Sequence, residues 1–253
     1  MSKPLLYLQD VTIGYDNRSV FEDINASAYK GEMIALVGAN GMGKSTLLKS
    51  IAALIKHRSG NILIDSKQIG LFKTRELANL VAFVPSHSHR ANRLSLIDMV
   101  SVSLYNNTNW IGSLSTEQKK VISETLKKVG LDGFEQRDSS SLSDGEFHRA
   151  SIARALIQNS KVILMDEPTA FLDISNKVTI IKLLKKIALD ENKTILFSTH
   201  DLQQAIKMCD KIWIMGHSGF MEGTPEAPIE KRAFETMFKD SSLKFDKNLY
   251  TLI

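Results

Sequence analysis

The sequence has almost none of the features that secreted or membrane-spanning chains require. Cys209 is the single cysteine among 253 residues, so an internal disulfide framework is excluded and a reducing compartment fits. No stretch reaches the roughly 18 uninterrupted apolar residues that a membrane helix needs, and even the apolar segment 178–184 contains Lys182. Any role at a membrane must therefore come through a partner protein.

A secretory signal and a dominant charge are missing as well. Gln9 and Asp10 end the apolar run 5–8 well short of a signal-peptide core, so we expect the chain to stay where it is made. Lys and Arg total 32 against 28 Asp and Glu, and the formal net charge of +4 selects no class of partner. The length and the 43% hydrophobic content fit one large globular domain with room for an inserted subdomain.

Short, unbroken apolar runs recur along the chain and indicate buried strands. They cover residues 34–37, 162–165, 194–197 and 212–215. Runs without alternation are typical of parallel strands that are covered on both faces. Helical periodicity lies between them, over 44–55, where Leu54 is placed on the apolar side, and over 178–188. This order predicts an α/β sheet.

The first 30 or so residues follow a different pattern. Apolar residues such as Leu6, Leu8, Val11 and Ile13 are spaced as in strands, and Gly14 is a turn signal. We predict an antiparallel β layer at the N-terminus.

The middle of the chain, about 94–157, is rich in helical patterns. They run over 96–104 and 116–129, and a further helix follows Ser143. We predict a helical subdomain of about residues 87–155, inserted into a core formed by about 1–86 and 156–253.

A glycine-rich loop follows the first buried strand. It matches the pattern G-x-x-x-x-G-K-[ST] at every fixed position and leads into a helix. Backbone N–H groups in such a loop turn toward phosphate oxygens, and the helix N-terminus adds partial positive charge. Lys44 should reach the β- and γ-phosphates, and Ser45 should offer its hydroxyl to Mg²⁺. The predicted phosphate-binding residues are Gly38, Ala39, Asn40, Gly41, Met42, Gly43, Lys44, Ser45 and Thr46.

Two later strands end in residues that suit hydrolysis. Asp166 and Glu167 follow the run 162–165, where Asp166 can hold Mg²⁺ through its waters and Glu167 can polarise the attacking water. His200 follows the strand at 194–198, from which it can reach the γ-phosphate and orient that water. We predict Lys44, Glu167 and His200 as the catalytic residues.

The segment Leu142-Ser143-Asp144-Gly145-Glu146 precedes a predicted helix and lies upstream of Asp166. One interpretation is a capping box, in which Ser143 and Glu146 satisfy the first N–H groups of that helix. A second interpretation rests on a family resemblance: the segment resembles the L-S-G-G-Q signature of ABC ATPases, which lies in this order between the two nucleotide motifs. Both interpretations can hold together.

The resemblance covers essentially the whole chain and implies further roles. Tyr15 matches the aromatic residue that stacks on adenine, and His200 matches the switch histidine. Asp173, at the end of 170–173, matches a residue that contacts the P-loop of the opposite subunit. Ser143, Gly145 and Glu146 would face the γ-phosphate bound to that subunit. The family fold is an α/β P-loop ATPase core with the N-terminal antiparallel β layer and the inserted helical subdomain.

The chain departs from the common family pattern at two places. Asp144 and Glu146 replace a Gly and a Gln of the commonest signature, a variant that resembles importers of metal chelates. Ser86 stands where the family usually has a glutamine. A serine can still bind Mg²⁺ or water, so we keep Ser86 with Ser45 and Asp166 as predicted metal ligands.

What the resemblance implies about function is an ATP-hydrolysing subunit of a transporter. Two copies would close head to tail around two Mg-ATP and act on a separate integral membrane permease, with the chain cytoplasmic and peripheral on the inner face of the membrane. Segments 100–110, 142–146 and 197–202 look like those of iron-siderophore, haem and cobalamin importer ATPases. We predict no nucleic acid partner.

Two rival functions use the same phosphate-binding loop. A non-transport ABC protein would act as an ATP-driven clamp or assembly factor, but such proteins generally carry tandem domains or a long coiled coil. A small-molecule kinase would have no use for residues 142–146.

Overall fold

The computed structural model describes residues 3–16, 18–86, 94–107, 114–170, 172–230, 233–237, 245–246 and 251–252. A six-stranded sheet forms its centre, in the order β10-β9-β3-β8-β7-β6. Neighbouring strands from β9 to β6 are parallel, and β10 joins β9 as an antiparallel edge. The strands are β3 (Met33–Gly38), β6 (Val81–Val84), β7 (Val162–Met165), β8 (Thr194–Ser198), β9 (Lys211–Gly216) and β10 (Gly219–Gly223).

A second, antiparallel sheet has the order β2-β1-β4-β5. Its strands are β1 (Leu6–Tyr15), β2 (Arg18–Ala28), β4 (Ser59–Ile64) and β5 (Lys67–Gln68). The predicted N-terminal antiparallel layer is confirmed, but it reaches beyond the first 30 residues, because β4 pairs with β1 from Leu6↔Ile64 to Thr12↔Ser59.

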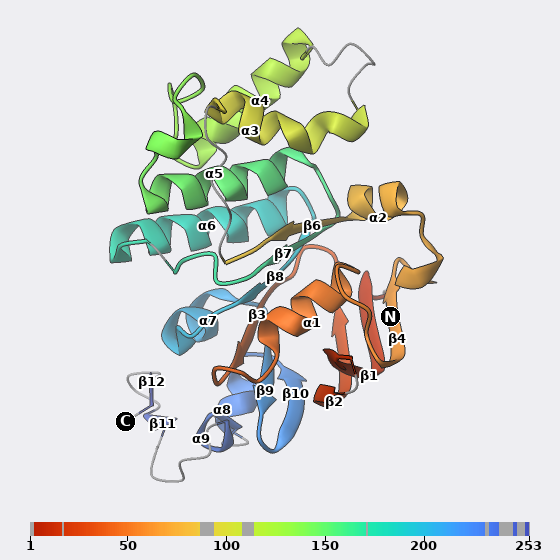
Figure 1. The fold of residues 1–253 in the computed structure, drawn as a ribbon. Helices are drawn as coiled ribbons and strands as arrows, with labels where there is room; N and C mark the ends of the chain where they lie inside the picture. The colour runs from red at the N-terminus through yellow and green to blue at the C-terminus, as the bar shows by residue number, and fades with distance from the viewer. Residues whose placement is uncertain are drawn as a thin grey trace.

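The central sheet is buried on both faces, as its unbroken apolar strands predict. Every residue of β3 is buried, and successive residues point into two different cores. Ala35 and Val37 pack on the side of α5 and α6, whereas Ile34 and Leu36 pack with α1 and the antiparallel sheet. Figure 1 shows these layers, with α5 and α6 above the sheet and α1 between the two sheets.

The helices of the first half of the chain are α1 (Lys44–Ile51), η1 (Ile69–Leu71), α2 (Thr74–Leu80), α3 (Leu96–Ser101), η2 (Val102–Asn107) and α4 (Thr116–Lys128). Those of the second half are η3 (Ser139–Ser141), α5 (Asp144–Ile157), α6 (Ile174–Asp190), α7 (Leu202–Met208), α8 (Glu226–Glu230) and α9 (Ala233–Thr236). A short hairpin of β11 (Phe245–Asp246) and β12 (Thr251–Leu252) follows. Helix α5 packs against α3 and α4, which forms the predicted helix-rich layer above α6 (Figure 1).

Helix α1 is shorter than predicted, since it ends at Ile51 instead of residue 55. Ala53 takes a left-handed backbone (φ 52°), Ala53 N–H bonds to the Ser50 carbonyl, and Leu54 N–H bonds to the Lys49 carbonyl. This pair of bonds is the Schellman ending, which usually has glycine at the left-handed position. Leu54, which was predicted on the apolar side, is therefore 60% exposed.

Helix α6 starts earlier than predicted, at Ile174 instead of residue 178, because the Asp173 carboxylate caps it. Helix α5 begins at Asp144, directly after the predicted cap residue Ser143. In both cases the cap residue was recognised as a functional candidate.

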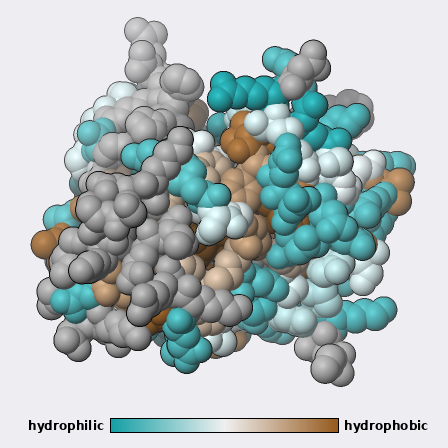
Figure 2. Space-filling view, turned by 90° about the horizontal axis from the view of Figure 1, so that it is seen from below, coloured by the Kyte–Doolittle hydropathy of each residue, from teal (hydrophilic) through white to brown (hydrophobic). Residues whose placement is uncertain are grey.

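Some apolar side chains lie on the surface. Ile174 is 82% exposed and Val102 is 62% exposed. Figure 2 shows apolar atoms at the centre of the face seen from below, with hydrophilic side chains beside them. Exposed apolar residues are normal in a folded chain, so by themselves they mark no interface. Within the part of the chain that the structure describes, no helix has the length and apolar character to cross a bilayer.

Candidate functional site

The loop between β3 and α1 has a backbone that requires glycine. Gly41 and Gly43 have φ of 80° and 98°, a left-handed region that side chains with a Cβ rarely adopt. A Cβ on Gly38 would lie 2.5 Å from the Met215 carbonyl oxygen of the neighbouring strand. The loop therefore runs tightly from strand to helix, which is the geometry that the sequence motif predicts for phosphate binding.

Lys44 is folded into this loop. Its ammonium donates to the carbonyl oxygens of Gly38, at 2.8 Å, and Ala39, at 3.2 Å, and the residue is 7% exposed. Burial lowers the pKa of Lys44, while the carboxylates of Glu167 and Asp166 act to raise it. A buried ammonium held by neutral carbonyl groups gains a strong partner when an anionic phosphate enters the loop.

Asp166 and Glu167 are organised by one serine hydroxyl. Ser198 Oγ donates to Asp166 Oδ1 at 2.7 Å and accepts from the Glu167 N–H at 2.9 Å. Asp166 is 4% exposed, and Ser198 is fully buried. Ser198 was not among the residues predicted from the sequence, although its position at the end of a buried strand, two residues before His200, was an available signal.

Glu167 and His200 form a pair beyond the carboxyl ends of the parallel strands β7 and β8. His200 Nε2 lies 2.7 Å from Glu167 Oε1. Glu167 has a left-handed backbone with φ of 52°, which is uncommon outside glycine and is concentrated at functional sites. The structure thus brings Lys44, Asp166, Glu167 and His200 into one region, as predicted.

Tyr15 and Ser86 border this region from other elements. The Tyr15 ring is 49% exposed, and its hydroxyl accepts from Thr46 Oγ1 at 3.2 Å. The loop after β6 carries Ser86, and β6 pairs in parallel with β7, the strand that leads to Asp166. Asn40, Met42 and Ser45 lie in the phosphate loop itself or at the first turn of α1.

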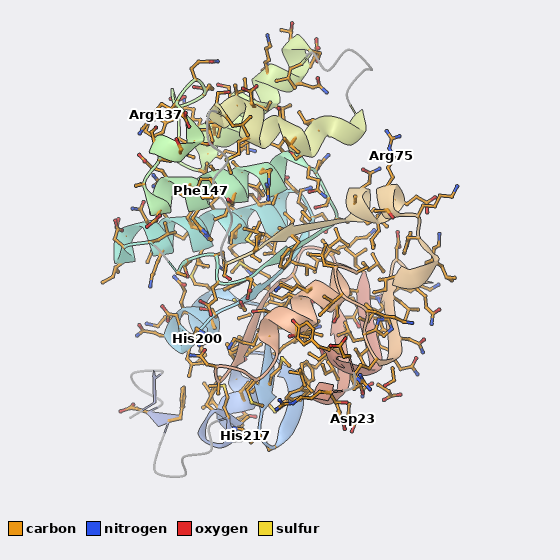
Figure 3. All side chains as sticks on the ribbon, in the orientation of Figure 1. Asp23, Arg75, Arg137, Phe147, His200 and His217 are labelled. Atoms are coloured by element: carbon orange, nitrogen blue, oxygen red, sulfur yellow. The ribbon has the colours of Figure 1, made fainter. Side chains whose placement is uncertain are left out.

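The segment 142–146 lies elsewhere in the chain. Ser143 Oγ accepts from the Glu146 N–H at 3.2 Å, and the Glu146 carboxylate accepts from the Ser143 N–H at 2.7 Å, so the capping box is present. Figure 3 places Phe147, in the first turns of α5, in the helical layer and His200 at the lower end of the sheet. Ser143, Gly145 and Glu146 are therefore not part of the region formed by Lys44 and Glu167 of the same chain.

Asp173 follows Glu167 in the sequence and caps the N-terminus of α6. Its carboxylate accepts from the backbone and side-chain N–H groups of Asn176, both at 2.8 Å. These hydrogen bonds lower the pKa of the Asp173 carboxyl group. The residue is exposed, so it can contact another chain while it caps the helix.

The predicted metal ligands fit Mg²⁺. Ser45, Asp166 and Ser86 offer hydroxyl and carboxylate oxygens, which hard cations prefer, and Mg²⁺ is usually held by one or two protein ligands plus waters and substrate phosphates. Within the described residues, no group of three or more His, Cys, Asp and Glu side chains could hold a metal. The site suits a cation that binds together with a nucleotide.

Comparison with known proteins agrees with this geometry. A family model described as ABC transporter matches residues 21–170. The petrobactin import ATP-binding protein FpuD of Bacillus anthracis is 31% identical, over 90% of this chain and 84% of that protein. The iron(3+)-hydroxamate import ATP-binding protein of Bacillus subtilis is 32% identical, over 80% of this chain and 75% of that protein. A dimeric ATP-binding cassette solved with ADP and Pi has a TM-score of 0.77 and 28% identity, and the match covers 87% of this chain and 98% of that one.

We predict that Ser198→Ala strongly reduces ATP hydrolysis, because the Asp166 carboxylate and the Glu167 backbone N–H both lose the hydroxyl that holds them in place. Hydrogen bonds to charged groups are worth about 1.5–3 kcal/mol, so the turnover number should fall about ten- to hundred-fold. The measurement is steady-state phosphate release at saturating Mg-ATP. Ser160→Ala is the matched control, since this buried hydroxyl bonds the Val162 carbonyl at the opposite end of β7. Equal rates in the parent and Ser198→Ala would contradict the assignment.

Proposed function

The chain belongs to the ABC transporter family as an ATP-binding and ATP-hydrolysing subunit, and we propose that it drives a separate membrane permease that imports an iron chelate, haem or cobalamin. The main observation in favour of an ATPase site is that Lys44, Asp166, Glu167 and His200 lie together at the carboxyl ends of the parallel strands. Residue roles, the metal, the permease and the cargo class are parts of this proposal.

The loop and Lys44 bind the phosphates of ATP. The Lys44 ammonium exchanges its bonds to the Gly38 and Ala39 carbonyl groups for phosphate oxygens, and the glycine backbone leaves the N–H groups free to turn inward. Ser45, Asp166 and Ser86 hold Mg²⁺, which would neutralise phosphate charge when bound. The Tyr15 ring, which is half exposed, stacks on the adenine base.

Glu167 and His200 act on the attacking water. The Glu167 carboxylate accepts a proton or a hydrogen bond from the water, and His200, at 2.7 Å from that carboxylate, holds it and contacts the γ-phosphate. The hydroxyl of Ser198 fixes Glu167 through its backbone N–H group and leaves the carboxylate free to point at the water. Catalysis is then mainly positioning and charge stabilisation.

A second copy of the chain completes each site. Ser143, Gly145 and Glu146 lie at the start of α5, which belongs to the helical layer (Figure 1), and Asp173 is exposed. In a head-to-tail dimer the N-terminus of α5 would face the γ-phosphate bound to the other copy, so the capping box and the phosphate contact would use the same helix end. The similar cassette that was solved as a dimer with ADP and Pi supports a site shared by two copies.

The permease and the cargo are inferred from the relatives and from the signature variant. The two import proteins described above carry the words petrobactin and iron(3+)-hydroxamate in their names, and Asp144 and Glu146 resemble the metal-chelate variant of the signature. These observations favour transport over a nucleic-acid clamp. The helical subdomain, about residues 87–155, would lie against a permease at the cytoplasmic face of the membrane.

We predict that Glu167→Gln abolishes ATP hydrolysis but preserves ATP binding, because the amide keeps the shape of the side chain but cannot accept a proton. ATP should then trap the dimer, which light scattering measures as a doubling of mass. Glu226→Gln, an exposed change on α8, is the control and should hydrolyse ATP normally. A protein with Glu167→Gln that stays monomeric at saturating ATP would count against the two-subunit site.

We predict that Ser143→Arg blocks hydrolysis, because the arginine would occupy the place of the γ-phosphate bound to the opposite subunit. Binding of a fluorescent ATP analogue to the single subunit should be almost unchanged. Ser115→Arg is a matched control, since Ser115 forms the same capping box with Gln118 at the start of α4. If both variants hydrolyse ATP equally well, residues 142–146 are only a helix cap.

We predict that a strain lacking the protein takes up less ferric siderophore, haem or cobalamin. Uptake is measured with the radiolabelled nutrients, and expression of the parent protein should restore it while expression of the Glu167→Gln variant should not. Normal uptake of all three nutrients in the deletion strain would refute the cargo class and leave the ATPase assignment intact.

A further inference from the structure

Residues 142–146 and Asp173, which would both face the opposite subunit in the proposed dimer, are connected within one chain. Arg149, on α5, donates from its guanidinium to Asn176 Oδ1 at 3.0 Å. Asn176, in the first turn of α6, donates from its side chain to Asp173 Oδ2 at 2.8 Å. A continuous path of hydrogen bonds therefore runs from α5, the helix that Ser143 caps, to the Asp173 carboxylate.

Asn176 and Arg149 are both partly buried, which limits the contact of their polar groups with water. Asn176 bonds Asp173 twice, through its backbone N–H and its side-chain amide, which leaves its carbonyl oxygen for Arg149. Arg149 is half-buried, and its Nε is buried with no hydrogen-bond partner among the described residues. Losing Asn176 would deprive a partly desolvated guanidinium of an acceptor, which is costly. The hydrogen bond between Arg149 and Asn176 is therefore expected to be maintained.

Charge strengthens the connection. Arg149 carries its positive charge between two carboxylates, Glu146 on its own helix and Asp173 on α6. The pKa of Glu146 is lowered mainly by the hydrogen bond from the Ser143 backbone N–H, and the pKa of Asp173 mainly by the hydrogen bond from the Asn176 backbone N–H. The positive charge of Arg149 lowers both pKa values further. The cation thus favours the charged form of an acidic group at the start of each helix.

We propose that Arg149 and Asn176 are positioning residues that join residues 142–146 to Asp173, so that one subunit presents both elements to the opposite nucleotide as a single unit. This inference rests on the two-subunit site of the proposed function. It adds a physical reason why contact at the signature segment and contact at Asp173 would be made together.

The test is a double-mutant cycle on dimer formation. Ser143→Ala, Asp173→Ala and the double variant are made in the Glu167→Gln protein, and the dissociation constant of the ATP-bound dimer is measured by analytical ultracentrifugation. Joined elements should show non-additive effects of at least about five-fold between the two changes. When Asn176→Ala is added to all four proteins, the effects should become additive within about two-fold. Binding of a fluorescent ATP analogue to the monomers should stay unchanged throughout and shows that each variant is folded.

Arg149→Lys tests the link from its other end. Lysine keeps the charge but lacks the planar fork that meets an amide oxygen, so it should remove the coupling as Asn176→Ala does. Combining both changes should have no larger effect than either one, since they break the same path. Lys177→Ala, next to Asn176 on α6, is the matched control and should leave the coupling intact.

The outcomes separate this inference from the proposed function. If the Glu167→Gln protein forms no dimer with ATP, the two-subunit site is wrong and the link has no role. If the dimer forms but Ser143 and Asp173 are already additive, or remain coupled after Asn176→Ala, the link alone is refuted and the two-subunit site stands.

Discussion

The functional region depends on the in-register pairing of three parallel strands. Met165 lies opposite Phe197 and Leu36 lies opposite Ser198, so the residues that follow these positions emerge side by side at one edge of the sheet. Asp166 is consequently next to Ser198, and the 2.7 Å bond between them is a direct result of this register. A shift of one residue in either pairing would turn the carboxylate or the hydroxyl to the opposite face of the sheet. The phosphate loop, the carboxylates and His200 are close together for the same reason.

Burial of charge suits this end of the sheet to the proposed binding of phosphate. Lys44 is nearly buried, and two carbonyl oxygens satisfy it only in part, because neutral acceptors bind an ammonium more weakly than anions do. The carboxylates of Asp166 and Glu167 oppose the loss of its charge, although burial has the larger effect on its pKa. A bound triphosphate would supply the missing anionic partner. The glycines around the lysine keep the backbone close enough for that exchange.

Two helix ends of this chain would have a second role in the proposed dimer. Ser143 and Asp173 each cap a helix and so satisfy its first N–H groups, which is a matter of stability within one subunit. Both also lie where the proposed dimer brings a foreign phosphate or loop. Hydrogen bonds between Arg149, Asn176 and Asp173 connect α5 to the first turn of α6, although the two cap residues Ser143 and Asp173 are 30 positions apart in the sequence.

The sequence by itself determined the elements whose chemistry is local. The spacing from Gly38 to Thr46, the apolar runs and the carboxylates that follow one of them predicted the phosphate loop, the parallel sheet and the catalytic residues, because these depend on neighbours along the chain. Tertiary structure decided the rest. The left-handed Ala53 that ends α1, the contact of Tyr15 with Thr46, the hydroxyl of Ser198 and the partnership of Arg149 with Asn176 all depend on backbone conformation or on distant segments. A hydrogen bond between residues 27 or 32 positions apart has no local signal, because it exists only after strand register and helix packing have brought the two side chains together.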